Sequence, residues 1–163
     1  MWPEPVQRVS TFLREAGAEA RIEEFPEGTP TARDAARAVG VDEAQIVKSL
    51  VFVCDGRPVA VLVPGDRRAD GAKVAREVGA SKARVARAEE VREATGFEAG
   101  GVAPFPLPRV DAVLIDQTLM SHDQVWVGAG SEHHMAQVTP QELVRLTRAR
   151  PMDAVEDRTY DSG

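Results

Sequence analysis

The sequence predicts a single α+β domain with a mixed, largely antiparallel sheet surrounded by short helices. Short apolar stretches typical of strands alternate with segments whose apolar residues recur at helical spacing. The chain has 163 residues, of which 43% are hydrophobic and 28% charged, which is enough for one well-buried core. We find no internal repeat and no linker, so we expect one domain over residues 1–163.

Local signals set the boundaries of the predicted elements. Thr31 is an N-cap residue with Asp34 three positions on, and Gly40 ends that helix. The turn residues 54–57 separate two apolar stretches and predict a hairpin. Residues 139–142 (TPQE) are the clearest helix start. The predicted elements are, in order, helix 4–16, strand 20–25, helix 31–39, strands 46–53 and 58–63, helix 70–78, a strand near 85, helix 89–94, strands 112–115, 124–127 and 135–138, and helix 139–147.

The charge of the chain is uneven. The formal net charge of −6 argues against a protein that coats nucleic acid non-specifically. Residues 67–92, however, carry eight basic and four acidic side chains, a local excess of positive charge. This basic window is either a solvated, salt-bridged surface or a face for an anionic ligand such as an acceptor stem.

Several classes of protein and site are not indicated. No basic segment precedes an apolar stretch at the N-terminus, and no apolar run approaches the length of a membrane span, so we expect a cytoplasmic protein without a membrane partner. Cys54 is the only cysteine and is interpreted as structural. Adjacent strand residues such as His133 and His134 point to opposite faces, and no metal-ligand spacing occurs. We therefore expect no metal ion and no cofactor.

Residues 95–105 (TGFEAGGVAPF) form the most informative segment. Three glycines and a proline disfavour a regular helix. Glycine lets backbone N–H groups approach a ligand closely, because it has no Cβ. The apolar residues Phe97, Val102 and Phe105 can anchor the segment. We therefore predict an ordered loop that lines a binding or catalytic site.

Two charged residues interrupt or end apolar strands. Lys48 lies within residues 46–53, where it is either a lysine that reaches water from the strand edge or a cation at the mouth of a pocket. Asp116 ends the apolar stretch 112–115, where it is either a turn-capping carboxylate or a partner for Lys48.

Taken in order, these segments resemble the YbaK/ProX family of aminoacyl-tRNA deacylases, which includes the editing domain inserted in bacterial prolyl-tRNA synthetases. The similar segments are 31–36 (TARDAA), 45–52 (QIVKSLVF), 60–66 (AVLVPGD), 95–97 (TGF), 100–105 (GGVAPF), 113–116 (VLID) and 127–130 (VGAG). The resemblance implies a deacylase core over about 29–147, with an N-terminal helix and strand within 1–28. The polar residues 151–163 are expected to be a flexible acidic tail.

The resemblance also implies a curved, barrel-like sheet and hydrolysis of the ester that joins a mischarged amino acid to tRNA. Lys48 would hold the terminal adenosine end, and the amides of Gly100 and Gly101 would orient the ester carbonyl or a water. These three residues are the predicted catalytic group. The predicted substrate-binding residues are Thr31, Ser49, Thr95, Gly96, Val102, Pro104, Asp116, Gly128, Gly130 and Ser131.

The predicted function is thus a free-standing, metal-independent trans-editing deacylase for a small amino acid, such as Ala or Cys on tRNA-Pro, with a prolyl-tRNA synthetase as a candidate partner. An already activated ester needs no strong side-chain nucleophile, and the sequence offers none. Residues 131–135 (SEHHM) differ from the better-known specificity subgroups of the family, which leaves the amino acid open. The alternatives are a non-catalytic module that binds a tRNA end or a nucleotide, and a structural domain without a small ligand.

Overall fold

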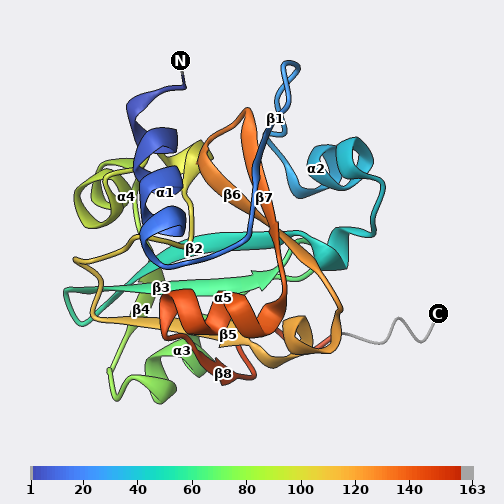
Figure 1. The fold of residues 1–163 in the computed structure, drawn as a ribbon. Helices are drawn as coiled ribbons and strands as arrows, with labels where there is room; N and C mark the ends of the chain where they lie inside the picture. Colours follow the sequence, from blue (N-terminus) through green and yellow to red (C-terminus); the bar gives the residue numbers. More distant parts are fainter. Residues whose placement is uncertain (1, 159–163) are drawn as a thin grey trace.

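The computed structural model describes residues 2–158. Its centre is the hairpin of β2 (Val47–Cys54) and β3 (Arg57–Pro64), which pair antiparallel along their whole length. β4 (Ala83–Val85) pairs antiparallel with β2, while β5 (Ala112–Asp116) runs parallel to β3 and β8 (Arg150–Met152) parallel to β5. The five strands have the order β4-β2-β3-β5-β8, and the hairpin runs across the middle of Figure 1.

A second sheet of three antiparallel strands lies beside the first. It has the order β1-β7-β6, formed by β1 (Ile22–Glu24), β7 (His134–Val138) and β6 (Val125–Ser131). A parallel bridge between Ile46 and Trp126 connects the two sheets. The prediction of a mixed, largely antiparallel α+β fold is confirmed. Within residues 2–158, however, the strands form two sheets and do not close into a barrel.

Short helices surround the sheets. The α-helices are α1 (Glu4–Glu15), α2 (Ala32–Val39), α3 (Gly71–Glu77), α4 (Ala88–Thr95) and α5 (Pro140–Thr147), and the 3-10 helices are η1 (Glu43–Gln45), η2 (Ala99–Gly101) and η3 (Gln117–Ser121). Two predicted N-caps are present. The Thr31 hydroxyl accepts a hydrogen bond from the Asp34 amide, and the Thr139 hydroxyl accepts one from the Glu142 amide, both at 3.1 Å.

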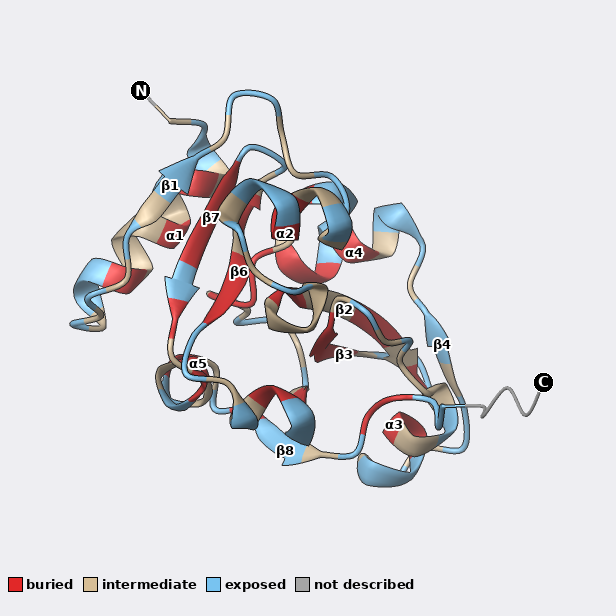
Figure 2. Ribbon diagram, turned by 90° about the vertical axis from the view of Figure 1, so that its right-hand side faces the viewer, coloured by how far each residue is buried: buried red, intermediate tan, exposed pale blue. Residues whose placement is uncertain are grey.

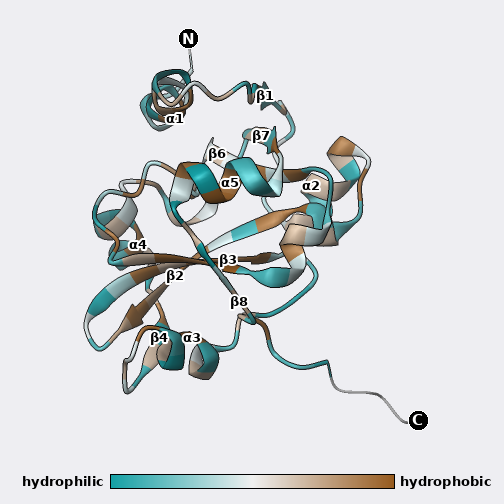
Figure 3. Ribbon diagram, turned by 60° about the horizontal axis from the view of Figure 1, so that its bottom comes forward, coloured by the Kyte–Doolittle hydropathy of each residue, from teal (hydrophilic) through white to brown (hydrophobic). Residues whose placement is uncertain are grey.

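The five-stranded sheet is buried on both faces. One face packs against α3, where Val74 meets Val61 and Phe52 in a core cluster. The other face packs against α5 and the second sheet, where Leu62 and Leu143 share the largest cluster. Figure 3 shows α3 on one side of β2 and β3 and α5 on the other, and Figure 2 shows β6 and β7 largely buried. Fully covered strands explain the nearly unbroken apolar run of β3.

The prediction of a flexible tail is wrong for residues 151–158. β8 extends the main sheet, and Ala154 and Val155 are 0% and 3% exposed. The Lys73 ammonium ties this segment to α3, since it donates to the Val155 carbonyl at 2.8 Å and pairs with Asp153 at 2.8 Å. The burial of two apolar residues and the contacts of the Lys73 ammonium therefore outweigh the polar composition. Residues 159–163 lie outside the described part.

Gly130 is where β6 passes the first turn of α1. Its φ is +106°, and a Cβ there would lie 2.8 Å from the Pro5 carbonyl and 2.9 Å from the Val6 nitrogen. The residue is thus required both by its backbone conformation and by the close approach of two elements.

We predict that Gly130→Ala lowers the free energy of unfolding by about 3 kcal/mol, because backbone strain and overpacking add. Gly17→Ala is the matched control: its φ is +69°, but nothing lies within 4 Å of a Cβ there. We expect this control to lose about 1 kcal/mol, from backbone strain alone. Urea unfolding followed by circular dichroism measures both values, and equal losses would contradict the packing argument.

Candidate active site

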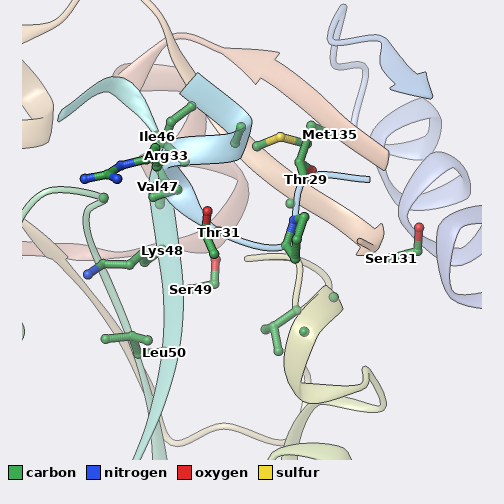
Figure 4. A pocket seen from close by; sticks show the side chains of 18 of the residues that line it. Thr29, Thr31, Arg33, Ile46, Val47, Lys48, Ser49, Leu50, Ser131 and Met135 are labelled. Atoms are coloured by element: carbon green, nitrogen blue, oxygen red, sulfur yellow. The ribbon is translucent and has the colours of Figure 1, made fainter. Parts of the chain in front are cut away.

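A cavity of about 480 Å³ opens between β2, α2, η2 and the turn that joins β6 to β7 (Figure 4). Its walls come from segments that are far apart in the sequence, because the two sheets and the glycine-rich loop meet here. The residues that line it are Thr29, Pro30, Thr31, Ala32, Arg33, Ala35, Glu43, Ile46, Val47, Lys48, Ser49, Leu50, Gly65, Ala99, Gly100, Gly101, Val102, Gly128, Ser131, His134 and Met135.

Lys48 and Ser49 are adjacent on β2, and their side chains lie on opposite faces of the strand. Leu50 and Phe52 pack in the apolar cluster between the five-stranded sheet and α3. Lys48 lies on the same face of β2, because alternate residues of a strand share a face. Val51, two residues from Ser49, packs with Val102 in a separate cluster on the other face. Figure 4 shows Lys48 and Leu50 pointing to one side of β2 and Ser49 to the other, where η2 lies.

Lys48 is a half-buried cation at the rim of the cavity. Its ammonium donates a hydrogen bond to the Arg67 carbonyl at 2.6 Å, which leaves two further N–H donors. Burial lowers the pKa of Lys48, while the carboxylate of Asp66 raises it and partly offsets that effect. Arg33 projects to the same side of β2 in Figure 4, and its side chain is 76% exposed. Arg33 pairs with Glu43 at 3.6 Å, so the rim presents the Lys48 cation beside an ion pair.

Ser49 has a different environment. Its Oγ is shielded from solvent and has no hydrogen-bond partner in the described part of the chain. The predicted cap residue Thr31 also lines the cavity, but its hydroxyl is engaged with Asp34. The cavity is lined by four hydroxyls, those of Thr29, Thr31, Ser49 and Ser131, and within residues 2–158 only that of Ser49 has no hydrogen-bond partner.

The glycine-rich loop forms the wall opposite β2. The amide of Gly101 donates to the Glu98 carbonyl at 2.9 Å inside η2, so the prediction that this amide is free for a substrate is wrong. The amide of Gly100 donates to no acceptor within residues 2–158. Gly101 is instead required by packing, because a Cβ there would lie 2.8 Å from the Ser131 Cα. Of the two glycines, Gly100 is the donor that the loop leaves available.

The β6–β7 turn is held against this loop. A Cβ on Gly128 would lie 2.7 Å from the Val102 carbonyl oxygen, so only glycine permits this approach. A β-bulge between Gly128 and Ser131 turns the end of β6 toward the cavity. Gly128, Val102 and Ser131 therefore line the cavity as expected, with Gly128 acting through its small size.

His134 is a cavity residue that the sequence analysis did not assign. It is 4% exposed, and its Nδ1 lies 2.6 Å from the Ser131 Oγ. Burial lowers the pKa of His134, which favours the neutral imidazole at pH 7. The ring of Trp2 packs edge-on against it at 5.4 Å. His134 is the first residue of β7, whereas His133 lies in the turn before it, and the sequence did not show this boundary.

Three predicted site residues lie outside the cavity because they hold the glycine-rich loop. The Thr95 hydroxyl accepts from the Phe97 amide at 3.0 Å and donates to the Val91 carbonyl at 2.7 Å. Gly96 ends α4 with a φ of +75°. Pro104 is buried without lining the cavity.

Asp116 and Gly130 also lie elsewhere. Asp116 is fully buried, and its carboxylate accepts from the Ala154 amide at 2.8 Å and from the amide and hydroxyl of Thr118. It is therefore a capping residue and not the partner of Lys48, whose ammonium bonds to Arg67. Gly130 faces α1, as described above.

Four of the eight cations of the basic window 67–92, Lys73, Arg84, Arg87 and Arg92, form ion pairs. Arg84 pairs with Glu90 at 2.8 Å, which lowers the pKa of Glu90 to about 2, and Arg92 pairs with Glu98 at 3.1 Å. Lys73 is held by the C-terminal segment. This favours a salt-bridged surface over a broad anion-binding face. Arg68, which is exposed, is the member of the window whose charge acts on Lys48 at the cavity rim.

Within residues 2–158, no group of three or more His, Cys, Asp and Glu side chains is arranged to hold a metal ion. In the same part of the chain, no helix combines the length and the apolar character needed to cross a membrane. Cys54 is buried, and burial raises the pKa of its thiol, which disfavours the nucleophilic thiolate.

Comparison with known proteins gives several matches across the chain. The uncharacterized protein YwhH of Bacillus subtilis is 34% identical over 85% of this chain and 88% of its own length. The proline–tRNA ligase of Lactobacillus helveticus is 30% identical over 98% of this chain, which spans 28% of that ligase. That of Nitratidesulfovibrio vulgaris is 35% identical over 86% of this chain, which spans 24% of it.

Solved structures agree with these matches. A proposed trans-editing enzyme for prolyl-tRNA synthetase superposes with a TM-score of 0.90 at 38% identity, over 96% of this chain and 100% of the other. The family model described as the aminoacyl-tRNA editing domain matches residues 26–146, which include every residue that lines the cavity. The chain therefore belongs to the aminoacyl-tRNA editing domain family.

Proposed function

We propose that the protein is an aminoacyl-tRNA deacylase that hydrolyses the ester between a mischarged amino acid and the terminal ribose of tRNA. A water oxygen attacks the ester carbonyl carbon, the bond from that carbon to the ribose oxygen breaks, and a proton passes to the ribose oxygen. The products are the free amino acid and tRNA with its terminal hydroxyl restored. The observation that carries this proposal is one cavity lined by a cation, Lys48, and by Gly100, whose backbone amide has no acceptor within residues 2–158.

The Gly100 amide is suited to the carbonyl oxygen of the ester. Negative charge develops on that oxygen during attack, and one fixed hydrogen-bond donor is worth up to about 3–4 kcal/mol of transition-state stabilisation where the bound substrate excludes water from it. A backbone amide held by packed glycines needs no rearrangement to act. The aminoacyl ester is activated, so this contribution and a positioned water suffice without a covalent intermediate.

Lys48 is suited to binding the tRNA backbone and not to acting on the ester group. Its face of β2 is opposite to that of Ser49, and its ammonium lies at the rim beside Arg33 and Arg68. We therefore assign Lys48 to a phosphate oxygen near the terminal adenosine, where a flexible cation with free donors binds well.

We further propose that the substrate carries a small amino acid, with Ala or Cys on tRNA-Pro as the leading candidates. The similarity to segments of proline–tRNA ligases and to a proposed trans-editing enzyme supports this choice. Synthetase pockets discriminate between amino acids that differ by one methylene by only about 1–3 kcal/mol. A second, hydrolytic site can therefore remove the amino acids that are attached in error. Such an enzyme acts in trans, in the cytoplasm and without a metal ion, alongside a prolyl-tRNA synthetase.

We expect the protein to hydrolyse alanyl- or cysteinyl-tRNA-Pro faster than prolyl-tRNA-Pro, with no loss of rate in EDTA. A panel of tRNAs charged with alanine, cysteine, serine and proline, followed by loss of labelled amino acid, measures this. Uncharged tRNA that binds tightly without turnover of any charged form would support the non-catalytic alternative. An EDTA-sensitive rate would overturn metal independence.

We expect Lys48→Ala to lower kcat/KM by roughly 10- to 100-fold, the effect of losing a charged hydrogen bond. The loss should appear mainly as a higher KM. The slope of log kcat/KM against log salt concentration should become shallower, by the amount that corresponds to about one phosphate contact. The fold should persist, because burial already disfavours the Lys48 ammonium. Lys82→Ala removes an exposed lysine of the basic window and serves as the control. A folded, fully active Lys48→Ala protein would refute this role.

A further inference from the structure

We infer that Ser49 is a positioning residue whose hydroxyl holds the attacking water against the ester carbonyl. This inference rests on the proposed deacylase function and assigns a step of it to one side chain. It also separates the roles of two adjacent residues: Lys48 binds the polynucleotide at the rim, whereas Ser49 acts at the reacting bond.

The first support is an unsatisfied polar atom. The Ser49 Oγ is buried in the cavity wall and has no hydrogen-bond partner within residues 2–158. A buried hydroxyl without a partner costs free energy of folding, and such groups are uncommon in folded proteins. A valine or alanine at this strand position would avoid that cost. The hydroxyl therefore finds its partner in something that enters the cavity.

The second support is the direction of the side chain. Ser49 lies between Val47 and Val51 on the face of β2 that packs toward the glycine-rich loop. Figure 4 shows it pointing toward η2, away from the side to which Lys48 points. The Gly100 amide lies on the opposite wall. An ester whose carbonyl oxygen faces Gly100 thus has its carbon between that wall and Ser49.

The third support is the chemistry of a hydroxyl. It accepts one hydrogen bond from a water proton and leaves a water lone pair directed at the carbonyl carbon. Ser49 itself forms no covalent bond: the water oxygen joins the carbonyl carbon, the ribose oxygen leaves, and the proton goes to that oxygen. Within residues 2–158, no base has a hydrogen bond to Ser49 that would make it a nucleophile.

Other cavity hydroxyls are less suited to this task. The Thr31 hydroxyl is engaged with Asp34 at the start of α2. The Ser131 hydroxyl lies 2.6 Å from the His134 ring and accepts from the His133 amide at 3.0 Å. Ser49 is the cavity hydroxyl, among the described residues, whose hydrogen bonds are all still available.

The test compares Ser49→Ala with the parent protein on the mischarged tRNA that the parent hydrolyses fastest. We expect kcat to fall about tenfold, the factor that corresponds to one hydrogen bond of roughly 1.4 kcal/mol in the transition state. KM for the tRNA should stay within about twofold, because polynucleotide binding is unaffected. The thermal midpoint should be unchanged or higher, because the variant removes an unsatisfied buried hydroxyl.

Two substitutions of equal shape separate the effect of the hydroxyl from the effect of side-chain volume. Ser49→Thr and Ser49→Val have the same shape, and both suit a strand, but only threonine keeps the hydroxyl. We expect the threonine variant to keep more activity than the valine variant. Ser81→Ala, at an exposed serine outside the cavity, should match the parent. If both bulky variants are inactive, the alanine variant alone decides.

Each outcome bears on a different claim. An inactive parent protein would overturn the proposed function itself. An active parent together with a Ser49→Ala variant of unchanged kcat would overturn only the role of Ser49. A rise in KM without a fall in kcat would also overturn it, because it would make Ser49 a binding residue. A lower thermal midpoint would show a structural role for the hydroxyl and contradict the inference.

Discussion

The pairing of β2 with β3 along their whole length is the constraint on which the rest of the structure depends. It places β2 between two apolar layers, so the pleat of one strand decides which side chains enter which layer. Lys48 and Ser49 are neighbours in the sequence, yet the pleat sends one to the rim and the other toward the glycine-rich loop. A register shift of one residue would exchange them and direct the lysine toward the glycine-rich loop.

The second wall of the cavity depends on close approach between backbones. Gly101 and Gly128 each occupy a position where a Cβ would lie within 3 Å of backbone atoms. The loop is thereby held against the β6–β7 turn, and the Glu132 side chain of that turn lies against Gly100. The many glycines of this region thus serve packing more than mobility, and the donor they present is rigid.

Much of the fold could be predicted from the sequence because its signals are local. The caps at Thr31 and Thr139 depend on residues three positions away, and both are present. The hairpin of β2 and β3 follows from two apolar stretches around a turn. The position of β8 beside β5, in contrast, depends on contacts between segments that are distant in the sequence, and no local pattern indicates it.

The candidate site was predictable in its location but less so in its residue roles. Lys48, Ser49, Gly100 and Gly128 line one cavity, as expected. From the sequence, Asp116 could not be distinguished from a site residue, because a carboxylate after a strand suits both a cap and a ligand-binding group. Its hydrogen-bond partner, the Ala154 amide, lies 38 positions away in the sequence. Whether an amide such as that of Gly101 is free also depends on a local turn that composition does not fix.

The isolated bridge between Ile46 and Trp126 has a mechanical consequence. The cavity takes one wall from the five-stranded sheet and another from the three-stranded sheet, and within residues 2–158 this bridge is the strand pairing that joins them. The width of the cavity is therefore set by side-chain packing between the two sheets, which share the largest apolar cluster. Substitutions that change the volume of this shared core would change the distance between the two cavity walls without touching a residue that lines them.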